Sequence, residues 1–454
     1  ENSTPQFGGV LTVSQTPVLI ILAGGASSRM WPLREKSLLR FGEQPLLLAQ
    51  LDRYREYGFR EVVIVGNPEN RNEITALARQ ASGLSIDVVV QVEPKGMGDA
   101  LLQIAPLFTE RPDTAIYVTQ VHDVVEDRLH QDILSLFKAN PRDSYLAGVE
   151  MADYFPGGYL VVDAEGRIQG IVEKPGPENR PSNLVSIVAH IHNHVGRLLD
   201  AIRAEYATNL PGDDHYERAM DRLMKAHTFR VVPYSGRWSA LKFPWHVLDI
   251  MDHLLSHEFA RLERQYGARP VQHVEEGAYI APGAVLSGDV IVKAGARVFH
   301  GAAVVGPAYI GANTIVGNNA LVRQSMILDN CNVGFTTEVA RSYVASGCQM
   351  HACRVLDSIF GPDVNFSAGC TTANLRIDHG LVSSAVKGHK VNTGRDKLGA
   401  IIGAGAFLGV DVMTMPGIKV GEGVQVGPGT HLHSDVKDRQ RVYVKQELIV
   451  VDND

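Results

Sequence analysis

The chain has 454 residues, a length that indicates two or three domains at about 150 residues each. Its formal net charge of −7 argues against a nucleic-acid partner and against an anionic membrane surface. The 44 glycines are the compositional anomaly, since glycine averages about 7% of residues, and the lack of a Gly-X-Y period excludes collagen.

Residues 1–17, ENSTPQFGGVLTVSQTP, contain no basic segment followed by an apolar run, which predicts a flexible leader rather than a signal peptide. No run of about 18 apolar residues occurs, so no transmembrane helix is expected. The 4 cysteines form no Cys-x-x-Cys pair and favour free thiols in a reducing compartment. Together these features predict a cytoplasmic protein.

The first part of the chain alternates short aliphatic runs with amphipathic stretches. We expect strands at 18–22, 61–66, 86–91 and 114–121, and helices at 46–57, 71–81 and 98–107. This alternation predicts an α/β, Rossmann-like fold with a parallel, doubly wound sheet, in which ligands bind at the carboxyl ends of strands. A further helix over 246–267 is predicted to join this part to the next.

The second part of the chain repeats every six residues. Aliphatic side chains recur at that spacing in a long run, and a shorter run with one threonine follows: Val274, Ile280, Leu286, Val292, Val298, Val304, Ile310, Val316, Val322 and Leu328, then Ile402, Leu408, Thr414, Val420, Val426 and Leu432. Hexapeptide repeats of this kind predict an all-β, left-handed parallel β-helix.

In such a β-helix one small aliphatic side chain per face points into a core too narrow for bulky aromatics. Glycines are expected at the corners, where a positive φ is costly for other residues. The predicted domains are a leader (1–17), an α/β domain (18–255), the end of a linker helix (256–270) and the β-helix (271–454).

A loop of small residues follows the first predicted strand. The sequence there is Leu22-Ala23-Gly24-Gly25-Ala26-Ser27-Ser28-Arg29-Met30, and Lys36 comes shortly afterwards. Small residues let backbone N–H groups approach a phosphate closely, and the two basic side chains add positive charge. The loop is neither the dinucleotide fingerprint nor a Walker P-loop.

This loop resembles the signature of sugar-1-phosphate nucleotidylyltransferases, Gly-Gly-x-Gly-[Ser/Thr]-Arg-[Met/Leu] before a lysine, with Ser27 at the third glycine. Further segments resemble motifs of that family in the same order: 91–100 (QVEPKGMGDA), 121–123 (VHD), 158–159 (GY) and 171–175 (IVEKP). With the hexapeptide repeats, the chain is most similar to archaeal-type bifunctional sugar-1-phosphate nucleotidylyltransferase/amino-sugar-1-phosphate acetyltransferases.

The resemblance implies a reaction in which a sugar-1-phosphate oxygen attacks the α-phosphorus of UTP or dTTP and pyrophosphate leaves. The implied catalytic residues are Arg29 and Lys36 on the triphosphate and Lys174 on the sugar phosphate. The implied nucleotide-binding residues are Leu22, Ala23, Gly24, Gly25, Gln91, Gly96 and Asp123, the last of which would also hold Mg²⁺. The implied sugar-binding residues are Gly158, Tyr159, Glu173 and Ser186.

Three positions depart from the family's pattern. Ala240 stands where a second Mg²⁺ ligand is expected, Ser186 stands where an asparagine contacts the sugar, and Ser27 replaces a glycine. The departures leave open a catalytically silent, sugar-nucleotide-binding regulatory paralogue as an alternative function.

A second activity is implied on the β-helix. By its spacing to Asp357 and Ser358, His351 corresponds to the general base of the related acetyltransferases, while Asn365 and Asn374 correspond to residues that bind acetyl-CoA or the acceptor. The tyrosine expected three residues after the base is Arg354. An acyltransferase with a vestigial first domain is therefore another alternative, and the resemblance implies a homotrimer or a dimer of trimers.

Two groups of residues allow metal sites. Alternation along a strand would place His190, His192 and His194 on one face, as a metal site or as the lining of a substrate cleft. Cys348, His351, Cys353 and Cys370 form a conceivable zinc set, although their spacing matches no zinc pattern.

Overall fold

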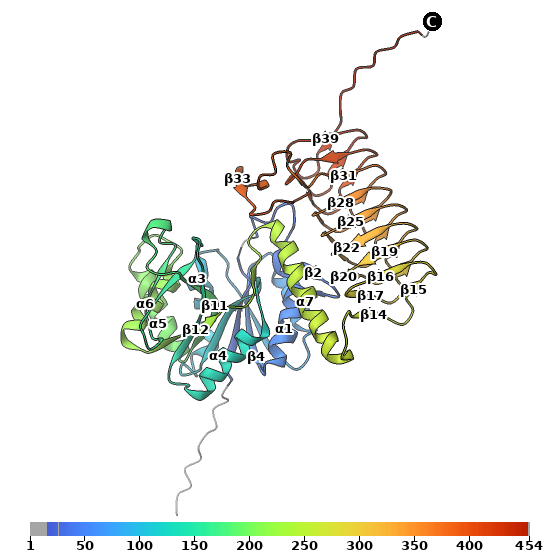
Figure 1. The fold of residues 1–454 in the computed structure, drawn as a ribbon. Coiled ribbons are helices and arrows are strands. Elements are labelled where there is room, and N and C mark those ends of the chain that lie inside the picture. The colour runs from blue at the N-terminus through green and yellow to red at the C-terminus, as the bar shows by residue number, and fades with distance from the viewer. Residues whose placement is uncertain (1–15, 26, 453–454) are drawn as a thin grey trace, which may run out of the picture. The chain divides into compact units, whose positions relative to one another are not determined.

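The computed structural model describes residues 16–25 and 27–452, which divide into two compact units (Figure 1). The first unit comprises the described residues up to 25 and residues 47–238, and the second comprises 27–46 and the described residues from 239 onward. In this division, segments 27–46 and 239–255 group with the β-helix. The predicted leader lies outside the described residues, apart from residues 16 and 17.

The first unit is built on a mixed sheet whose strands follow the order β10-β9-β11-β6-β1-β4-β5, with β8 beside β11 and β12 beside β8. Its strands are β1 (Val18–Leu22), β4 (Glu61–Gly66), β5 (Ser85–Val90), β6 (Ile116–Gln120), β8 (Ser144–Glu150), β9 (Gly158–Val162), β10 (Ile168–Glu173), β11 (Leu184–His192) and β12 (Phe229–Tyr234). Two short strands, β7 (Asp123–Val125) and β13 (Trp238–Ala240), lie outside this sheet.

Helices cover both faces of this sheet. One face packs against α1 (Leu46–Glu56), α2 (Arg71–Ala78) and α4 (Asp127–Ala139). The other packs against α3 (Gly96–Leu102), α5 (Val195–Ala207) and α6 (His215–Ala226). Strand β1 contributes Leu19 and Ile21 to one core and Val18, Ile20 and Leu22 to the other, which explains its unbroken aliphatic sequence.

The α/β prediction is confirmed for the parallel strands β6, β1, β4 and β5. The expectation of a wholly parallel sheet is wrong, because β11 runs antiparallel to both β6 and β8, and β9 pairs antiparallel with β10. Strands β9 and β10 follow one another through a short connection, which suits an antiparallel pair and cannot hold the crossover that a parallel pair needs. Short 3-10 helices complete the chain: η1 (Lys36–Leu38), η2 (Ala105–Phe108), η3 (Pro177–Asn179) and η4 (Pro244–His246).

The second unit contains η1 and the short hairpin of β2 (Arg40–Phe41) and β3 (Gln44–Pro45), and it continues from residue 239 with η4 and α7 (Val247–Tyr266). Its main body is a parallel β-helix with three sheets, consistent with the predicted left-handed form (Figure 1). A hairpin of β32 (Ser383–Val386) and β33 (His389–Asn392) projects from the coils.

Each coil contributes one short strand to each sheet. The first sheet holds β14 (Gln272–Val274), β17 (Val290–Val292), β20 (Ala308–Ile310), β23 (Met326–Ile327), β26 (Tyr343–Val344), β29 (Ile359–Phe360), β34 (Ile401–Ile402) and β37 (Lys419–Val420). The second holds β15 (Tyr279–Ile280), β18 (Arg297–Val298), β21 (Ile315–Val316), β24 (Asn332–Val333), β27 (Gln349–Met350), β30 (Asn365–Phe366), β35 (Phe407–Leu408), β38 (Gln425–Val426) and β40 (Arg441–Val442). The third holds β16 (Val285–Ser287), β19 (Ala303–Val305), β22 (Leu321–Arg323), β25 (Glu338–Ala340), β28 (Arg354–Leu356), β31 (Thr371–Thr372), β36 (Met413–Thr414) and β39 (His431–Leu432).

The six-residue period breaks after Val322. The next side chain in the core is Ile327 rather than Leu328, because the corner between β22 and β23 is one residue shorter than the repeat requires. Leu328 is buried but lies outside the β-helix core. Shorter corners and the inserted hairpin explain why the period cannot be followed through the sequence between the two runs.

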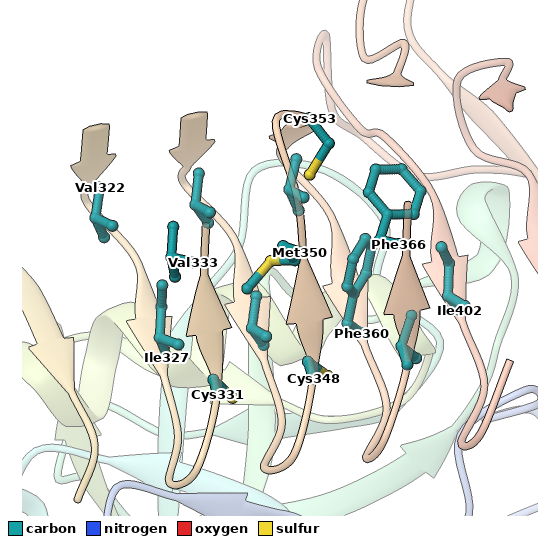
Figure 2. Close-up of a cluster of buried hydrophobic side chains, with 14 of the residues drawn as sticks. Val322, Ile327, Cys331, Val333, Cys348, Met350, Cys353, Phe360, Phe366 and Ile402 are labelled. Atoms are coloured by element: carbon teal, nitrogen blue, oxygen red, sulfur yellow. The ribbon is translucent and has the colours of Figure 1, made fainter. Parts of the chain in front are cut away.

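The β-helix core also contains aromatic side chains, so the expectation of an aromatic-free core is wrong. Phe360 and Phe366 are fully buried with ring centroids 5.1 Å apart, and Figure 2 shows them on neighbouring faces of the core. The third face of that coil contributes Thr372, a smaller side chain, so the volume is shared unequally among the faces.

The cysteines have a packing role in the same core. Each lies two residues before an inward side chain, the position that alanine holds in earlier coils such as Ala296 before Val298. Figure 2 shows three of them among the aliphatic side chains, and all 4 are free and buried.

Glycines in the β-helix follow two separate constraints. Gly295 has a φ of +73° at a corner, as predicted. Gly311 has no such φ, but a Cβ atom there would lie 2.4 Å from the carbonyl carbon of Leu328 in the next coil. Corners are also formed by other residues, such as Asn313 with a φ of +58°.

No helix among the described residues is long and apolar enough to cross a membrane.

We expect Phe366→Ala to lower the free energy of unfolding of the β-helix by about 3–5 kcal/mol, because the truncation leaves a cavity in a closely packed core. Urea unfolding followed by circular dichroism measures the loss. Phe407→Ala is the matched control, since Phe407 lies on the adjacent strand and is 47% exposed. Equal losses in the two variants would contradict the packing role of Phe366.

Candidate active site

The loop after β1 is held by the neighbouring strand β4. The Ala23 N–H donates to the Val65 carbonyl oxygen at 2.8 Å. The side-chain amide of Asn70 donates to the Ala23 carbonyl oxygen at 2.9 Å, and that of Asn67 donates to the Gly24 carbonyl oxygen at 3.3 Å. Sequence reasoning missed both asparagines, although two asparagines directly after a buried strand were an available signal.

Gly24 has no room for a side chain. A Cβ atom there would lie 2.9 Å from the Gly66 carbonyl oxygen and 3.2 Å from Oε1 of Gln91. At Gly25, by contrast, an added Cβ atom would have no other atom within 4 Å. The glycine turn therefore lies directly against the residue predicted to bind the base.

Gln91 follows β5 and is almost completely buried. Its Nε2 donates to the Gly96 carbonyl oxygen at 3.0 Å and to Oδ2 of Asp99 at 2.9 Å. Because both partners only accept hydrogen bonds, they fix the orientation of the amide, and its Oε1 atom is the one on the side of Gly24. The atom offered here is an acceptor, which suits a ring N–H such as N3–H of uracil or thymine.

Asp123 begins β7 close to the carboxyl end of β6, and it is 6% exposed. Nε1 of Trp238 donates to its Oδ1 atom at 3.2 Å, and the Gln50 side chain donates to its backbone oxygen at 3.2 Å. A buried carboxylate of fixed orientation fits Mg²⁺, which in phosphate-binding sites takes one or two carboxylates and completes its shell with phosphate oxygens and water. Ala240, at the end of β13, offers no ligand atom.

The hairpin of β9 and β10 places the predicted sugar-contacting residues together. Glu173 pairs with Gly158, where a Cβ atom would lie 3.3 Å from Oε2 of Glu173. Tyr159 is fully buried, and its hydroxyl accepts a hydrogen bond from the Phe155 N–H at 2.8 Å. Tyr159 therefore stabilises the turn through its buried hydroxyl, while Glu173 is the polar side chain that this hairpin contributes to the candidate site.

Lys174 has a left-handed backbone with a φ of +45°. Its Nζ atom lies 3.2 Å from Oε1 of Glu173 and 3.2 Å from Oδ2 of Asp213. Burial lowers the pKa of Lys174, but the two carboxylates outweigh burial and raise the pKa above its usual value. The side chain is therefore a permanent ammonium, as phosphate binding requires.

A chain of buried polar groups lies under this hairpin. The Ser186 hydroxyl is 2.9 Å from Nε2 of His190, and the Tyr216 hydroxyl is 2.9 Å from Nδ1 of His190 and 2.7 Å from Nε2 of His192. Burial lowers the pKa of His190 to about 3 and that of His192 well below its usual value, so both rings are neutral. Ser186 is thus tied to a histidine in the interior.

The expectation of three histidines on one strand face is wrong. Strand β11 ends at His192, and His194 is the N-cap of α5, where its Nδ1 accepts from the Arg197 N–H at 3.2 Å. His190 and His192 are each only 2% exposed and cannot line an open cleft. Across the described ranges, no group of three or more His, Cys, Asp or Glu side chains is arranged to hold a metal ion.

An acidic cavity of about 390 Å³ adjoins Glu173. It is lined by Ile171, Val172, Glu173, Glu205, Asp214, Glu217, Arg218, Asp221 and Arg222. Burial, and next the charge of Glu173, raise the pKa of Glu217 to about 8. Sequence reasoning missed Glu217, because nothing in the helical sequence of α6 distinguishes it from the other acidic residues there.

The predicted triphosphate ligands Arg29 and Lys36 belong to the second unit. The Arg29 guanidinium lies 5.7 Å from the ring centroid of Phe243. The Ser27 hydroxyl donates to Oε1 of Glu35 at 3.1 Å, and Glu35 caps η1, the helix that begins with Lys36. A glycine at position 27 could not make this bond, so the departure at Ser27 serves the local structure.

The predicted acetyltransferase residues lie at two corners of the β-helix. His351 is exposed just after β27, and Asn365 is on β30, the next strand of the same sheet. Asn374 follows β31 of another sheet, where its Nδ2 donates to Oδ2 of Asp357 at 2.5 Å. Asp357 also accepts both hydrogen bonds of Arg341, at 2.6 Å each.

The hypothesis of a zinc site formed by Cys348, His351, Cys353 and Cys370 is wrong. Cys348, Cys353 and Cys370 are buried in the β-helix core, whereas His351 is exposed. Burial raises the pKa of Cys353 to about 12 and that of Cys370 to about 11, which keeps both as neutral thiols.

Comparison with known families agrees with these two units. Residues 18–234 match the nucleotidyl transferase family, and residues 286–390 match the family described as the GMPPB C-terminal domain. The protein therefore combines a nucleotidyl transferase domain with a β-helix domain.

Relatives of the whole chain make the assignment more specific. The bifunctional sugar-1-phosphate nucleotidylyltransferase/acetyltransferase of Sulfurisphaera tokodaii is 28% identical over 92% of this chain and 97% of that protein. The bifunctional protein GlmU of Methanococcus aeolicus is 26% identical over 95% of this chain and 98% of that protein. A crystal structure of UDP-glucose pyrophosphorylase with UDP-glucose aligns with 54% of this chain and 99% of its own at 19% identity and a TM-score of 0.44. The chain is thus a homologue of the bifunctional nucleotidylyltransferase/acetyltransferases along most of its length.

We expect Glu217→Gln to raise the melting temperature at pH 8 by several degrees and to leave it unchanged near pH 4.5. The native pKa of about 8 exceeds the ordinary 4.5, so the unfolded state binds fewer protons between these values and the wild type loses stability as pH rises. Differential scanning calorimetry at both pH values checks this, with the exposed Glu150→Gln as control. A gain of equal size at pH 4.5 would contradict the titration of Glu217.

Proposed function

We propose that this protein transfers a nucleotidyl group from UTP or dTTP to a sugar-1-phosphate, with Mg²⁺, and releases pyrophosphate. The observation that carries the proposal is the fixed amide of Gln91, whose Oε1 atom faces the glycine turn at the carboxyl edge of the parallel strands. A base that donates a ring N–H to this oxygen would lie beside the backbone N–H groups of the turn, which bind phosphate.

The reaction needs positioning and charge neutralisation more than covalent chemistry. Lys174 holds the phosphate group of the sugar-1-phosphate, and an oxygen of that phosphate attacks the α-phosphorus in line. Glu173 accepts hydrogen bonds from sugar hydroxyls. Arg29 and Lys36 neutralise the triphosphate. Asp123 would hold Mg²⁺, which offsets the charge of the phosphates.

The test is pyrophosphate release with Mg²⁺, each nucleoside triphosphate in turn and a panel of sugar-1-phosphates. We expect release with UTP or dTTP only, since both offer the same N3–H edge to Gln91. Lys174→Met should lower kcat/KM for the sugar-1-phosphate at least a hundredfold, because it removes the only charge assigned to that phosphate. Arg180→Met is the control, since this half-buried cation lies near the same hairpin and its guanidinium donates to the Ala152 carbonyl oxygen at 2.8 Å.

Nucleotide binding by calorimetry without pyrophosphate release from any pair would instead identify a silent, sugar-nucleotide-binding regulatory protein. Release that is unaffected by Lys174→Met would contradict the role of that lysine.

We propose in addition that the β-helix acetylates an amino sugar phosphate with acetyl-CoA, His351 being the general base. The support is the exposure of His351 beside Asn365 and the bifunctional names of the whole-length relatives. In one chain His351 precedes a strand of the third sheet and Asn374 follows one, so the two residues lie at opposite edges of that sheet, and we propose that a second copy completes a site that uses both. A homotrimer through the β-helix supplies this second copy.

We expect His351→Ala to abolish thiol release from acetyl-CoA in the presence of glucosamine-1-phosphate, while pyrophosphate release stays at the wild-type rate. A thiol reagent follows the first reaction, and light scattering after size-exclusion chromatography gives the oligomeric state. His389→Ala is the control, an exposed histidine on the projecting hairpin. Thiol release that persists in His351→Ala would contradict the assignment of the base.

A further inference from the structure

The segment that carries Arg29 and Lys36 is attached to the β-helix at its amino-terminal end. Nε of Arg34 donates to Oε2 of Glu422 at 2.9 Å, and Nε1 of Trp31 donates to Oδ1 of Asp438 at 2.9 Å. Asp438 also accepts from the Glu422 N–H at 2.8 Å, so both contacts are made with one corner of the last coils.

A second attachment holds the other end of the segment several coils away. Nη2 of Arg40 lies 2.8 Å from Oδ2 of Asp329, and the Tyr343 hydroxyl donates to the Arg40 carbonyl oxygen at 2.7 Å. The Phe41 ring packs on Tyr343 with centroids 5.5 Å apart, and Glu43 forms an ion pair with Lys293.

A buried cation lies next to the first attachment. Lys419, on β37, is 1% exposed, and its Nζ donates to the Ala385 carbonyl oxygen at 2.5 Å. The same ammonium lies 5.9 Å from the ring centroid of Trp31 and 5.8 Å from that of Trp245. An ammonium removed from water gains from aromatic faces, so Lys419 ties the indole of Trp31 to the coil.

These contacts lie on both sides of Lys36 and directly after Arg29, the two predicted phosphate ligands. Lys36 lies between Arg34 and Arg40, and Arg29 lies two residues before Trp31. The backbone on both sides of Lys36 is therefore fixed to coils that are far apart in the sequence. By contrast, a spacer or an oligomerisation domain would need no such contacts with a loop of the nucleotide site.

We infer that the β-helix fixes the conformation of segment 27–46, with Trp31, Arg34, Lys419 and Glu422 as positioning residues that hold the backbone carrying Arg29 and Lys36, the predicted triphosphate ligands. The inference rests on the proposed nucleotidyl transfer. None of the four touches the reacting atoms in this account, and each acts through the segment 27–46.

The test uses the full-length double variant Trp31→Phe/Glu422→Gln, which removes the indole N–H and the ion pair while keeping an aromatic ring at position 31 and the side-chain size at position 422. We expect the KM for the nucleoside triphosphate to rise about tenfold, with the KM for the sugar-1-phosphate unchanged. The exchanged pair Arg34→Glu/Glu422→Arg should recover most of the affinity that Glu422→Gln alone loses. Glu338→Gln is the matched control, because it breaks an ion pair with Arg323 on the same β-helix, at 3.0 Å, that does not involve the segment.

Hydrogen exchange measured by mass spectrometry on residues 27–46 tests the attachment without any activity. We expect faster exchange of that segment in the double variant and no change in the control. Unchanged exchange would overturn the attachment, and faster exchange with an unchanged KM for the triphosphate would overturn its positioning role. A wild-type protein without pyrophosphate release would overturn the proposed function and this inference with it, whereas the exchange result would still decide whether the segment is attached.

Discussion

The burial of strand β1 on both faces is the constraint on which the nucleotidyl transferase unit depends. Its five aliphatic residues alternate between two separate cores. The strand therefore cannot slide along its neighbours without removing side chains from the core in which they pack. The loop at its end is consequently fixed relative to β4, which Asn67 and Asn70 follow, and to β5, which Gln91 follows. The close approach of Gly24 to Gln91 follows directly from that placement.

The β-helix depends on a different constraint, the small volume inside each coil. Alanine and cysteine occupy the tightest positions, and Thr372 offsets the two phenylalanines of its own coil. Because adjacent coils touch, several glycines are needed for the approach of one backbone to the next and not for a corner. The cysteines thus need no chemical role, since their buried thiols replace alanine in a packed interior.

Both units bury ionisable side chains, and the protein stabilises each of these side chains in a different way. His190 and His192 are kept neutral around one tyrosine hydroxyl, whereas Lys174 keeps its charge beside two carboxylates. The Lys419 ammonium contacts a carbonyl oxygen and two indole rings, while the Lys419 backbone N–H donates to the Asp435 carboxylate, and burial lowers the pKa of the Lys419 side chain to about 8. Glu217 is the corresponding acid, and a pKa raised to about 8 gives it a proton at neutral pH.

Much of this protein was determined by local sequence. The aliphatic run of β1, the alternation up to β6 and the six-residue period as far as Val322 each follow from a short-range rule, so both fold classes could be predicted. The order of the motifs also led to a set of candidate site residues, whose roles stay a prediction. The sequence could not place His194 on a cap rather than a strand, or Phe366 in the core, because a strand's end and a coil's free volume depend on distant neighbours.

Only the tertiary structure decided that segment 27–46 belongs with the β-helix rather than with the strand that precedes it. Arg34 and Glu422 are separated by 388 positions in the chain, and no periodicity or motif links residues so far apart. A motif records which residue types occur in a loop, whereas the contacts that hold the loop come from whichever part of the chain folds against it.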